Sequence, residues 1–366
     1  MTNREAQIFQ WITENPMISQ EELAAKAGIA RSSAAVHISN LMKKGYILGK
    51  GYVTNGPSYC MVIGGANIDI GGISKEEIVT RESEAEQCSS GKMFWSLGGA
   101  ARNICHNLRL LGVNVRFITA IGGDEYGHKM IESCDELGID ITDSLRSAGT
   151  NTSTYLYLTD EKRAVKYAVS DMGICEKLNP EFLSTKIEQL NKARMVVIDT
   201  NIPTQTIHYI CKNCKAPVFA EAISVRQAHK LQSVLGQLYA ITVNQQEAEA
   251  ISGVTITDRH SLEKAANVIF EKGTKNIFIT MGSEGAYCVC EEEQFMVEGF
   301  SNRVMNHSGT RDAFMAGVAL GYMKHMDVQQ MAKLGVTVLS FALADEAIIN
   351  PQLCLPAVVE RANIEF

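Results

Sequence analysis

The sequence predicts an α/β protein in which a small N-terminal head of helices precedes a large, doubly wound parallel sheet. Continuous apolar runs at residues 60–63, 195–198 and 277–279 are typical of strands that are covered on both faces. Stretches with helical periodicity lie between these runs, and this alternation is the pattern of a parallel sheet. A chain of 366 residues is long enough for one large domain and one small one.

Residues 1–56 predict three helices and a β hairpin. Ile8 and Ile12 lie four positions apart, on one face of a first helix. Ser19 and Glu22 have the spacing of a capping box at the start of a second helix. A third helix is expected at residues 31–44, followed by a short β wing with a basic tip and by a linker that ends before the larger domain begins at Tyr59.

This head resembles the winged helix-turn-helix of bacterial regulators, so we expect residues 1–56 to bind DNA. A helix fits the major groove, where its exposed side chains reach base edges and lysines reach phosphates. The side chains expected to face DNA are Arg31, Ser32, Ser33, His37, Asn40 and Lys50. The alternative is a helical appendage that mediates self-association.

The charge distribution restricts nucleic-acid binding to the head. The chain has a formal net charge of −7, and residues 1–56 contain six basic and four acidic side chains, which leaves −9 for the rest. Because the rest of the chain is acidic, we do not expect it to bind nucleic acid non-specifically. Since the head carries only +2, one copy would bind DNA weakly, and we expect a homodimer that contacts two half-sites.

From residue 59 to residue 366, strands alternate with predicted helices. The helical stretches are expected at residues 100–112, 127–138, 261–272 and 312–325. Residues 71–96 and 151–169 interrupt the alternation and contain short β-like pieces, so we expect them to form a small β lid beside the main sheet. Asp124, which follows another strand, is expected to cap the next helix.

Two glycine-rich segments predict a site for a hydroxylated ligand. Asn67 and Asp69 follow the first strand, and a carboxylate there is suited to binding vicinal hydroxyls. Gly98 and Gly99 precede a helix that carries Asn103. Glycines allow the backbone to approach a sugar ring closely, while the amide can bind a hydroxyl.

Two further segments have the features of a nucleotide site. Asn244 and Glu247 follow a strand and lie three positions apart, so they share one face of a helical turn. An amide and a carboxylate there suit hydrated magnesium and phosphate oxygens. Residues 280–285 follow the next strand and are expected to form a nucleotide-facing loop. The candidate ATP-binding residues are Asn244, Thr280, Gly282, Ser283 and Gly285.

The last segment combines an anion site with a base. Gly309, Thr310 and Arg311 form a turn that leads into a helix expected to begin at Asp312. Backbone N–H groups at a helix start bind anions. A carboxylate at that point can take a proton from a substrate hydroxyl.

The order of these motifs resembles that of the ribokinase-like (PfkB) carbohydrate and nucleoside kinases over residues 59–366, and most closely that of pseudouridine kinase-type nucleoside kinases. Residues 64–69, 101–104 and 350–351 indicate the latter. The resemblance implies ATP and Mg²⁺ as cofactors, Asp312 as general base, the turn before it as anion hole, and Glu247 as a magnesium ligand through water. It also implies that Asn67, Asp69 and Asn103 bind the ribose-like part, and that the lid often forms a dimer interface.

The sequence departs from the family signature at two positions. Arg311 replaces a glycine that lets the backbone pass close to the transferred phosphate, and Asn306 replaces the leading acid, so the family's monovalent-cation site is in doubt. The charge of Arg311 can also stabilise the transition state, as an arginine finger does. Three functions stay open. The first is an ATP-dependent kinase that phosphorylates a hydroxymethyl group of a nucleoside or pentose-type sugar. The second is a catalytically impaired, kinase-like sensor that regulates transcription. The third is an active kinase that also regulates its own operon, with ligand occupancy coupled to DNA affinity.

The remaining features indicate a cytoplasmic protein without a membrane partner. No apolar run approaches 18 residues, and the N-terminus leads directly into an amphipathic segment. The ten scattered cysteines are expected to be reduced thiols, including the Cys211 and Cys214 pair, because no second pair lies at a distance useful for zinc.

Overall fold

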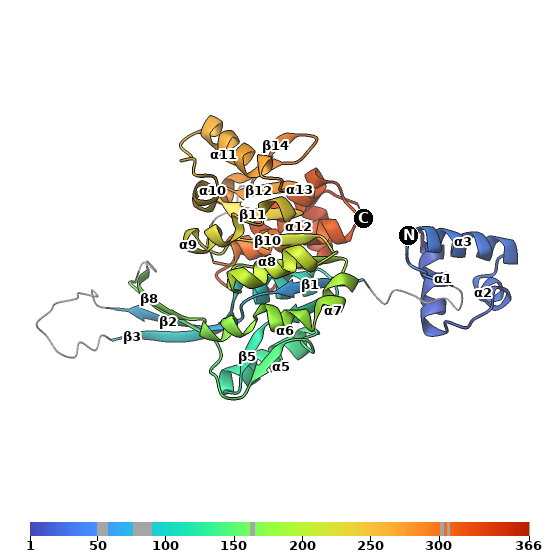
Figure 1. The fold of residues 1–366 in the computed structure, drawn as a ribbon, viewed down its shortest axis with the longest axis horizontal. Helices are drawn as coiled ribbons and strands as arrows, with labels where there is room; N and C mark the ends of the chain where they lie inside the picture. Colours follow the sequence, from blue (N-terminus) through green and yellow to red (C-terminus); the bar gives the residue numbers. More distant parts are fainter. Residues whose placement is uncertain (50–57, 76–89, 162–164, 301–303, 306–307, 366) are drawn as a thin grey trace, which may run out of the picture. The chain divides into compact units, whose positions relative to one another are not determined.

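The computed structural model describes residues 1–49, 58–75, 90–161, 165–300, 304–305 and 308–365. The chain divides after Ser58 into two units, Met1–Ser58 and Tyr59–Phe366 (Figure 1). The tip of the predicted β wing at Lys50 and its second strand lie outside the described residues. Within the described ranges, no helix is both long and apolar enough to cross a lipid bilayer.

The N-terminal unit is built from α1 (Asn3–Glu14), α2 (Gln20–Ala27) and α3 (Arg31–Lys43). Ser19 and Glu22 form the predicted capping box at the start of α2, and Gly28, at φ 63°, ends that helix in the left-handed conformation. The apolar side chains that face inward are Ile8, Ile12, Ile18, Leu23, Ile38, Leu41 and Ile47.

An ion pair between an exposed lysine and a buried glutamate joins the first and third helices of this unit. Lys44 Nζ donates to Glu5 Oε2 at 2.8 Å, and the backbone N–H of Thr2 donates to the same oxygen at 2.7 Å. The hydrogen bond from Lys44 lowers the pKa of the buried Glu5 to about 2. Lys44 therefore stabilises the head and is not a free phosphate-binding lysine.

The main sheet has eight strands in the order β14-β13-β12-β11-β10-β9-β1-β4. The strands are β1 (Cys60–Ile63), β4 (Val115–Ile118), β9 (Met195–Asp199), β10 (Val218–Glu221), β11 (Ala240–Asn244), β12 (Asn276–Thr280), β13 (Gly285–Val289) and β14 (Gln294–Glu298). The six strands from β4 to β12 in this order pair in parallel, and β13 and β14 continue the sheet antiparallel.

Helices cover both faces of this sheet, as a doubly wound fold requires. In β1, Cys60 and Val62 face one apolar core, whereas Met61 and Ile63 face the other. The helices of the first core are α4 (Ala100–Leu110), α5 (Glu125–Leu137), α12 (Thr310–Met323), α13 (Val328–Leu343) and α14 (Leu355–Ala362). Those of the second core are α6 (Pro180–Ser184), α7 (Ile187–Lys192), α8 (Thr204–Asn213), α9 (Val225–Ala228), α10 (Gln245–Ser252) and α11 (Arg259–Glu271).

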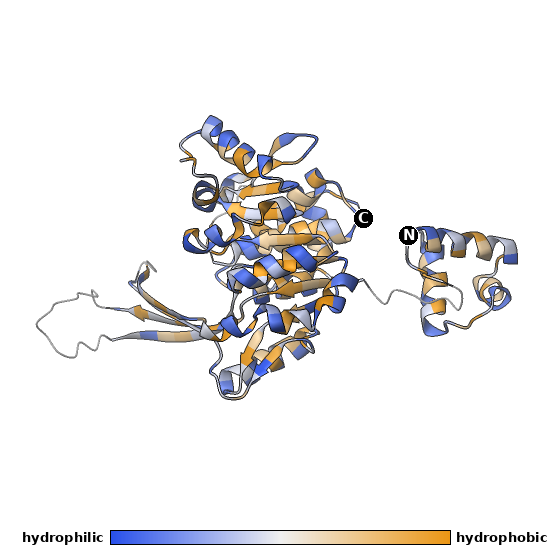
Figure 2. Cartoon of the chain, viewed as in Figure 1, coloured by the Kyte–Doolittle hydropathy of each residue, from blue (hydrophilic) through white to orange (hydrophobic). Residues whose placement is uncertain are grey.

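Burial on both faces explains why the strands are continuous apolar runs, as Figure 2 shows for the centre of the sheet. The prediction that Asp124 caps a helix is confirmed, because its side chain accepts from Gly127 N at the start of α5. The helix at Asp312 begins two residues earlier than predicted, at Thr310, because Gly309 is its N-terminal cap.

A second, four-stranded sheet stands off the main one within the larger unit (Figure 1). Its order is β3-β2-β7-β8, and its strands are β2 (Asn67–Ser74), β3 (Gly91–Gly98), β7 (Thr154–Thr159) and β8 (Val165–Asp171). A separate two-stranded sheet consists of β5 (Ala120–Gly122) and β6 (Leu145–Ser147). Asn67 and Asp69 therefore lie inside β2, and not in a loop at the end of the first strand, because the chain enters the small sheet at once.

Candidate active site

The parallel strands bring their polar C-terminal residues to one edge of the main sheet. Asp199 ends β9, Glu221 ends β10, Asn244 ends β11 and Thr280 ends β12. Asn244 and Thr280 are direct register partners on neighbouring strands. Ligands of open α/β sheets bind outside this edge, and most of the predicted site residues lie around it.

Asn67 and Asp69 are held together beside a tightly packed glycine. Asn67 Nδ2 donates to Asp69 Oδ1 at 2.7 Å. Gly98 is the register partner of Asn67 in β3, and a Cβ at Gly98 would lie 2.2 Å from Asp69 Oδ2. Burial raises the pKa of Asp69 to about 6, and the hydrogen bond from Asn67 partly opposes this. The carboxylate of Asp69 therefore requires glycine at position 98.

Asp199, which sequence reasoning missed, fixes the loop next to this pair. Its Oδ2 accepts from Gly65 N at 2.9 Å and from Ala101 N at 3.2 Å, so it joins the first loop to the start of α4. Gly99 caps α4 with φ 99°, and a Cβ there would lie 2.5 Å from Gly65 O. A carboxylate directly after the apolar run at residues 195–198 was the signal that could have identified Asp199.

Asn103 and Asp312 meet although 209 positions separate them in the chain. Asn103 Nδ2 donates to Asp312 Oδ2 at 2.8 Å, and both side chains are buried. Burial raises the pKa of Asp312 to about 6, while the bond from Asn103 and the charge of Arg311 oppose the rise. A carboxylate that titrates near neutral pH is suited to accept a proton from a bound alcohol.

The turn before Asp312 uses the glycine that the family signature retains. Gly309 has φ 74°, and a Cβ there would lie 2.8 Å from Ile348 O. Thr310 and Arg311 form the first helical positions of α12, and the N-terminus of a helix is a favourable place for an anion. Asn306 and His307 lie outside the described residues.

The side chain of Arg311 points to the ends of β10 and α10. Its Nη1 donates to Ala222 O at 2.8 Å, its Nη2 donates to Ile223 O at 2.6 Å, and Nη1 also pairs with Glu247 Oε1. These carboxylate and carbonyl partners compensate a cation at a helix N-terminus, which the helix dipole disfavours.

Glu247 does not fit the expected role of magnesium ligand through water. Its Oε1 is paired with Arg311, and its Oε2 accepts from Asn244 N at 2.9 Å as part of a capping box of α10. In the described part of the chain, no cluster of three or more His, Cys, Asp and Glu side chains could hold a metal ion. Cys211 and Cys214 are free thiols.

The predicted nucleotide loop has one exposed part and one packed part. Gly282 and Ser283 are exposed in a 3-10 turn, η4 (Gly282–Glu284), and a Cβ at Gly282 would meet nothing within 4 Å. Gly285 is buried at the start of β13, where a Cβ would lie 2.0 Å from Val297 O. Strand packing therefore explains Gly285, and a contact of Gly285 with ATP remains a prediction.

On the head, the predicted DNA-facing side chains of α3 are exposed or half-buried. Arg31, Ser32 and Ser33 are exposed, whereas His37 and Asn40 are half-buried. Arg31 Nη1 lies 3.1 Å from Glu21 Oε1 at the surface, a pairing that solvent and salt weaken.

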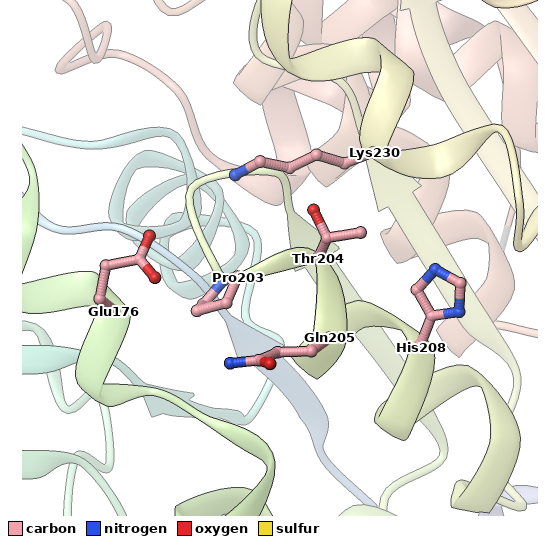
Figure 3. A pocket seen from close by; sticks show the side chains of 6 residues that line it. All are labelled: Glu176, Pro203, Thr204, Gln205, His208 and Lys230. Atoms are coloured by element: carbon pink, nitrogen blue, oxygen red, sulfur yellow. The ribbon is translucent and has the colours of Figure 1, made fainter.

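A pocket of about 680 Å³ is lined by none of the predicted site residues (Figure 3). It is lined by Glu176, Pro203, Thr204, Gln205, His208 and Lys230. Lys230 Nζ donates to Thr200 O at 2.7 Å, and a ring nitrogen of His208 bonds the hydroxyl of Ser233 at 2.8 Å. These two side chains thus have partners in the protein itself.

Comparisons with protein families match both units. The model of the pfkB family of carbohydrate kinases matches residues 57–353, and that of the winged helix-turn-helix DNA-binding family matches residues 5–47. The predicted winged helix-turn-helix is confirmed by this match, although the tip and the second strand of its wing fall outside the described residues.

Two curated proteins of Escherichia coli strain K12 are similar to this chain. The uncharacterized sugar kinase YeiI is 31% identical over 355 residues, which cover 96% of this chain and 97% of that protein. Pseudouridine kinase is 30% identical over 303 residues, which cover 82% of this chain and 95% of that protein.

Solved structures confirm the predicted ribokinase-like fold. Ribokinase from Thermotoga maritima has a TM-score of 0.73 at 21% identity and covers 84% of this chain and 100% of that chain. A carbohydrate kinase from Agrobacterium tumefaciens has a TM-score of 0.72 at 22% identity and covers 84% of this chain and 97% of that chain.

Proposed function

Because the chain belongs to the pfkB family of carbohydrate kinases, we propose that it transfers the γ-phosphate of ATP to a hydroxymethyl group of a pseudouridine-like nucleoside or a pentose-type sugar. The observation that carries the proposal is the carboxylate of Asp312. It is 8% exposed, it has a pKa of about 6, and it lies at the first turn of α12 beside Asn103.

Asp312 acts as the general base in this proposal. The hydroxymethyl oxygen loses its proton to the carboxylate, forms a bond to the γ-phosphorus, and the bond from that phosphorus to the ADP oxygen breaks. The hydrogen bond from Asn103 holds one carboxylate oxygen, which supports a fixed orientation of the other. General bases of this kind contribute roughly 10²–10⁴-fold to a rate.

The acceptor would bind between the small sheet and α4. The Asn67–Asp69 pair offers an amide and a carboxylate for vicinal hydroxyls. Gly98 and Gly99 allow the backbone to pack closely against Asp69 and Gly65 beside this pair. The similarity to a pseudouridine kinase over 82% of this chain supports a C-nucleoside as acceptor. Similarity to a sugar kinase over 96% of the chain keeps a pentose as the alternative acceptor.

The phosphates of ATP would lie over the turn at Gly309. The turn leads into a helix N-terminus, which favours anions. Asn244, Thr280, Gly282 and Ser283 lie at the ends of β11 and β12, and we propose that they contact the nucleotide. Family members use ATP together with a metal ion, but Glu247 is not a candidate ligand here because Arg311 is paired with it.

A substrate panel tests the proposal. Purified protein with ATP and Mg²⁺ should release ADP and yield a phosphorylated product with pseudouridine, uridine, ribose or 2-deoxyribose. The kcat/KM for pseudouridine should exceed that for ribose. No product with any of these acceptors would contradict the kinase assignment and favour a body that only binds its ligand.

A second function, DNA binding, is favoured by the winged helix-turn-helix at residues 5–47. We propose that α3 enters the major groove and that ligand occupancy of the kinase unit changes DNA affinity. Fluorescence anisotropy with DNA selected from a random pool tests this in the full chain. Asn40→Ala should weaken binding, whereas Arg4→Ala, on α1, should not. Equal DNA affinities of the two variants would exclude α3 as the helix that enters the major groove.

The small sheet supports the proposal of a homodimer. Several apolar side chains on it are exposed, namely Met93, Phe94, Trp95, Leu156, Leu158, Val165 and Val169, with Met93 at 74%. Apolar patches of this kind mark association sites. Light scattering should give twice the chain mass, and Val169→Lys should give the monomer. A monomeric wild-type protein would contradict the proposal.

A further inference from the structure

An oxygen-lined site surrounds the guanidinium of Arg311. The three acceptors are the carbonyl oxygens of Ala222 and Ile223 and the Oε1 atom of Glu247. Carbonyl and carboxylate oxygens are the ligands that Mg²⁺ and Ca²⁺ prefer in proteins. The donor set around this side chain is therefore that of a hard cation.

Two buried polar side chains next to this site have oxygens without a hydrogen-bond partner among the described residues. Glu221 is 1% exposed, and neither of its carboxyl oxygens has a hydrogen-bond partner. Thr242 is its register partner on β11, and the buried hydroxyl of Thr242 also lacks a partner. Because register partners point to the same face of a sheet, the side chains of Glu221 and Thr242 lie on one face.

The carboxyl groups around Arg311 favour a positive charge at this site. Burial, and after it the charge of Asp312, raise the pKa of Glu221 well above its ordinary value. The charges of Glu247, Glu221 and Asp312 raise the pKa of Arg311 against the effect of its own burial. A cation between these groups is stabilised, whereas its removal would leave several carboxyl groups uncompensated in a buried site.

We propose that this oxygen-lined site is a cation site whose built-in occupant is the guanidinium of Arg311, so that the chain binds no divalent ion at Glu247. A divalent ion that accompanies ATP then receives its ligands from the phosphates and from water. Arg311 also holds the first turn of α12, which carries Asp312, against the end of β10. The inference refines the proposed kinase but does not depend on phosphoryl transfer.

Binding of Mn²⁺ in the absence of nucleotide and acceptor tests the proposal. Electron paramagnetic resonance of free Mn²⁺ counts the bound ions, and thermal unfolding with and without Mn²⁺ gives a second readout. Glu247→Gln should not lower the number of Mn²⁺ ions that the otherwise wild-type protein binds. Arg311→Ala should gain one site per chain with a dissociation constant of roughly 10⁻⁴–10⁻³ M and should be stabilised by Mn²⁺.

Two control variants separate charge from shape. Adding Glu247→Gln to Arg311→Ala should weaken the new site by about tenfold or more. Arg311→Lys should bind no Mn²⁺ at this site, because the lysine ammonium keeps a cation there. A wild-type site that Glu247→Gln abolishes would overturn the proposal, even if Arg311→Ala does not fold. An Arg311→Ala protein that folds without gaining a site, or Mn²⁺ binding by Arg311→Lys, would overturn it as well.

Because no ATP or acceptor is present, these results do not depend on turnover. An inactive protein with the expected Mn²⁺ pattern would contradict the proposed function and leave the cation site intact. An active protein whose Glu247 binds Mn²⁺ would support the proposed function and contradict the proposed cation site.

Discussion

Replacing Asp312 with asparagine should abolish most of the catalysis and, at the same time, stabilise the fold. Asparagine has nearly the same shape, and its Oδ1 can still accept the 2.8 Å hydrogen bond that Asn103 Nδ2 donates. The substitution removes only the negative charge and the ability to accept the substrate proton. We expect kcat to fall by roughly 10²–10⁴-fold, with little change in nucleoside binding measured by calorimetry.

The expected stabilisation follows from the pKa of about 6, against an ordinary 3.8 for aspartate. One pKa unit corresponds to about 1.4 kcal/mol, so ionising Asp312 costs the folded state about 3 kcal/mol at pH 8. A carboxyl group whose folded pKa is raised loses its stabilising contribution as the pH rises through the folded pKa. Asp312→Asn should therefore exceed wild type by up to about 3 kcal/mol at pH 8 and by about half as much at pH 5.

Urea unfolding at the two pH values measures this difference, and initial rates measure turnover. Wild-type kcat/KM should rise with pH, reach half its maximum near pH 6 and level off above about 7, because the base must be ionised. Asp258→Asn is the matched control. The exposed Asp258 caps α11 at a distance from Asp312 in the sequence, and asparagine caps a helix equally well. It should change neither property. A full-rate Asp312→Asn enzyme, or one less stable than wild type at pH 8, would refute the reasoning.

Three other results are expected. Gly98→Ala should raise the KM for the acceptor at least about tenfold, because its Cβ would lie 2.2 Å from Asp69 Oδ2; an unchanged KM would contradict the proposed hydroxyl contact. Glu5→Gln should destabilise the head by about 1 kcal/mol at pH 7, because it weakens the hydrogen bond from Lys44. Since the pKa of Glu5 is lowered to about 2, the wild-type protein should lose this advantage as the pH falls from about 4.5 towards 2. Thermal unfolding monitored by circular dichroism measures the difference. Deleting residues 1–58 should leave the melting temperature of the remaining unit unchanged, and its collapse would show that the head is structural.

The sequence by itself determined the local elements and their class. Apolar runs such as residues 195–198 predicted buried strands, because covered parallel strands need apolar side chains on both faces. Ser19 and Glu22 predicted the start of α2, because a capping box is formed within four residues. The order of short motifs also indicated the family, and with it the candidate base Asp312.

Only the tertiary structure decided which side chains meet. Asn103 reaches Asp312 across 209 positions, and Arg311 reaches Glu247 across 64. The second pairing arises because β10 lies next to β11, which brings the end of β10 and the start of α10 to the same edge of the sheet. The periodicity of the sequence indicates which residues are buried within one helix or strand. The order of the strands, in contrast, depends on how the whole sheet is buried. For this reason the expected magnesium ligand proved to be the partner of an arginine.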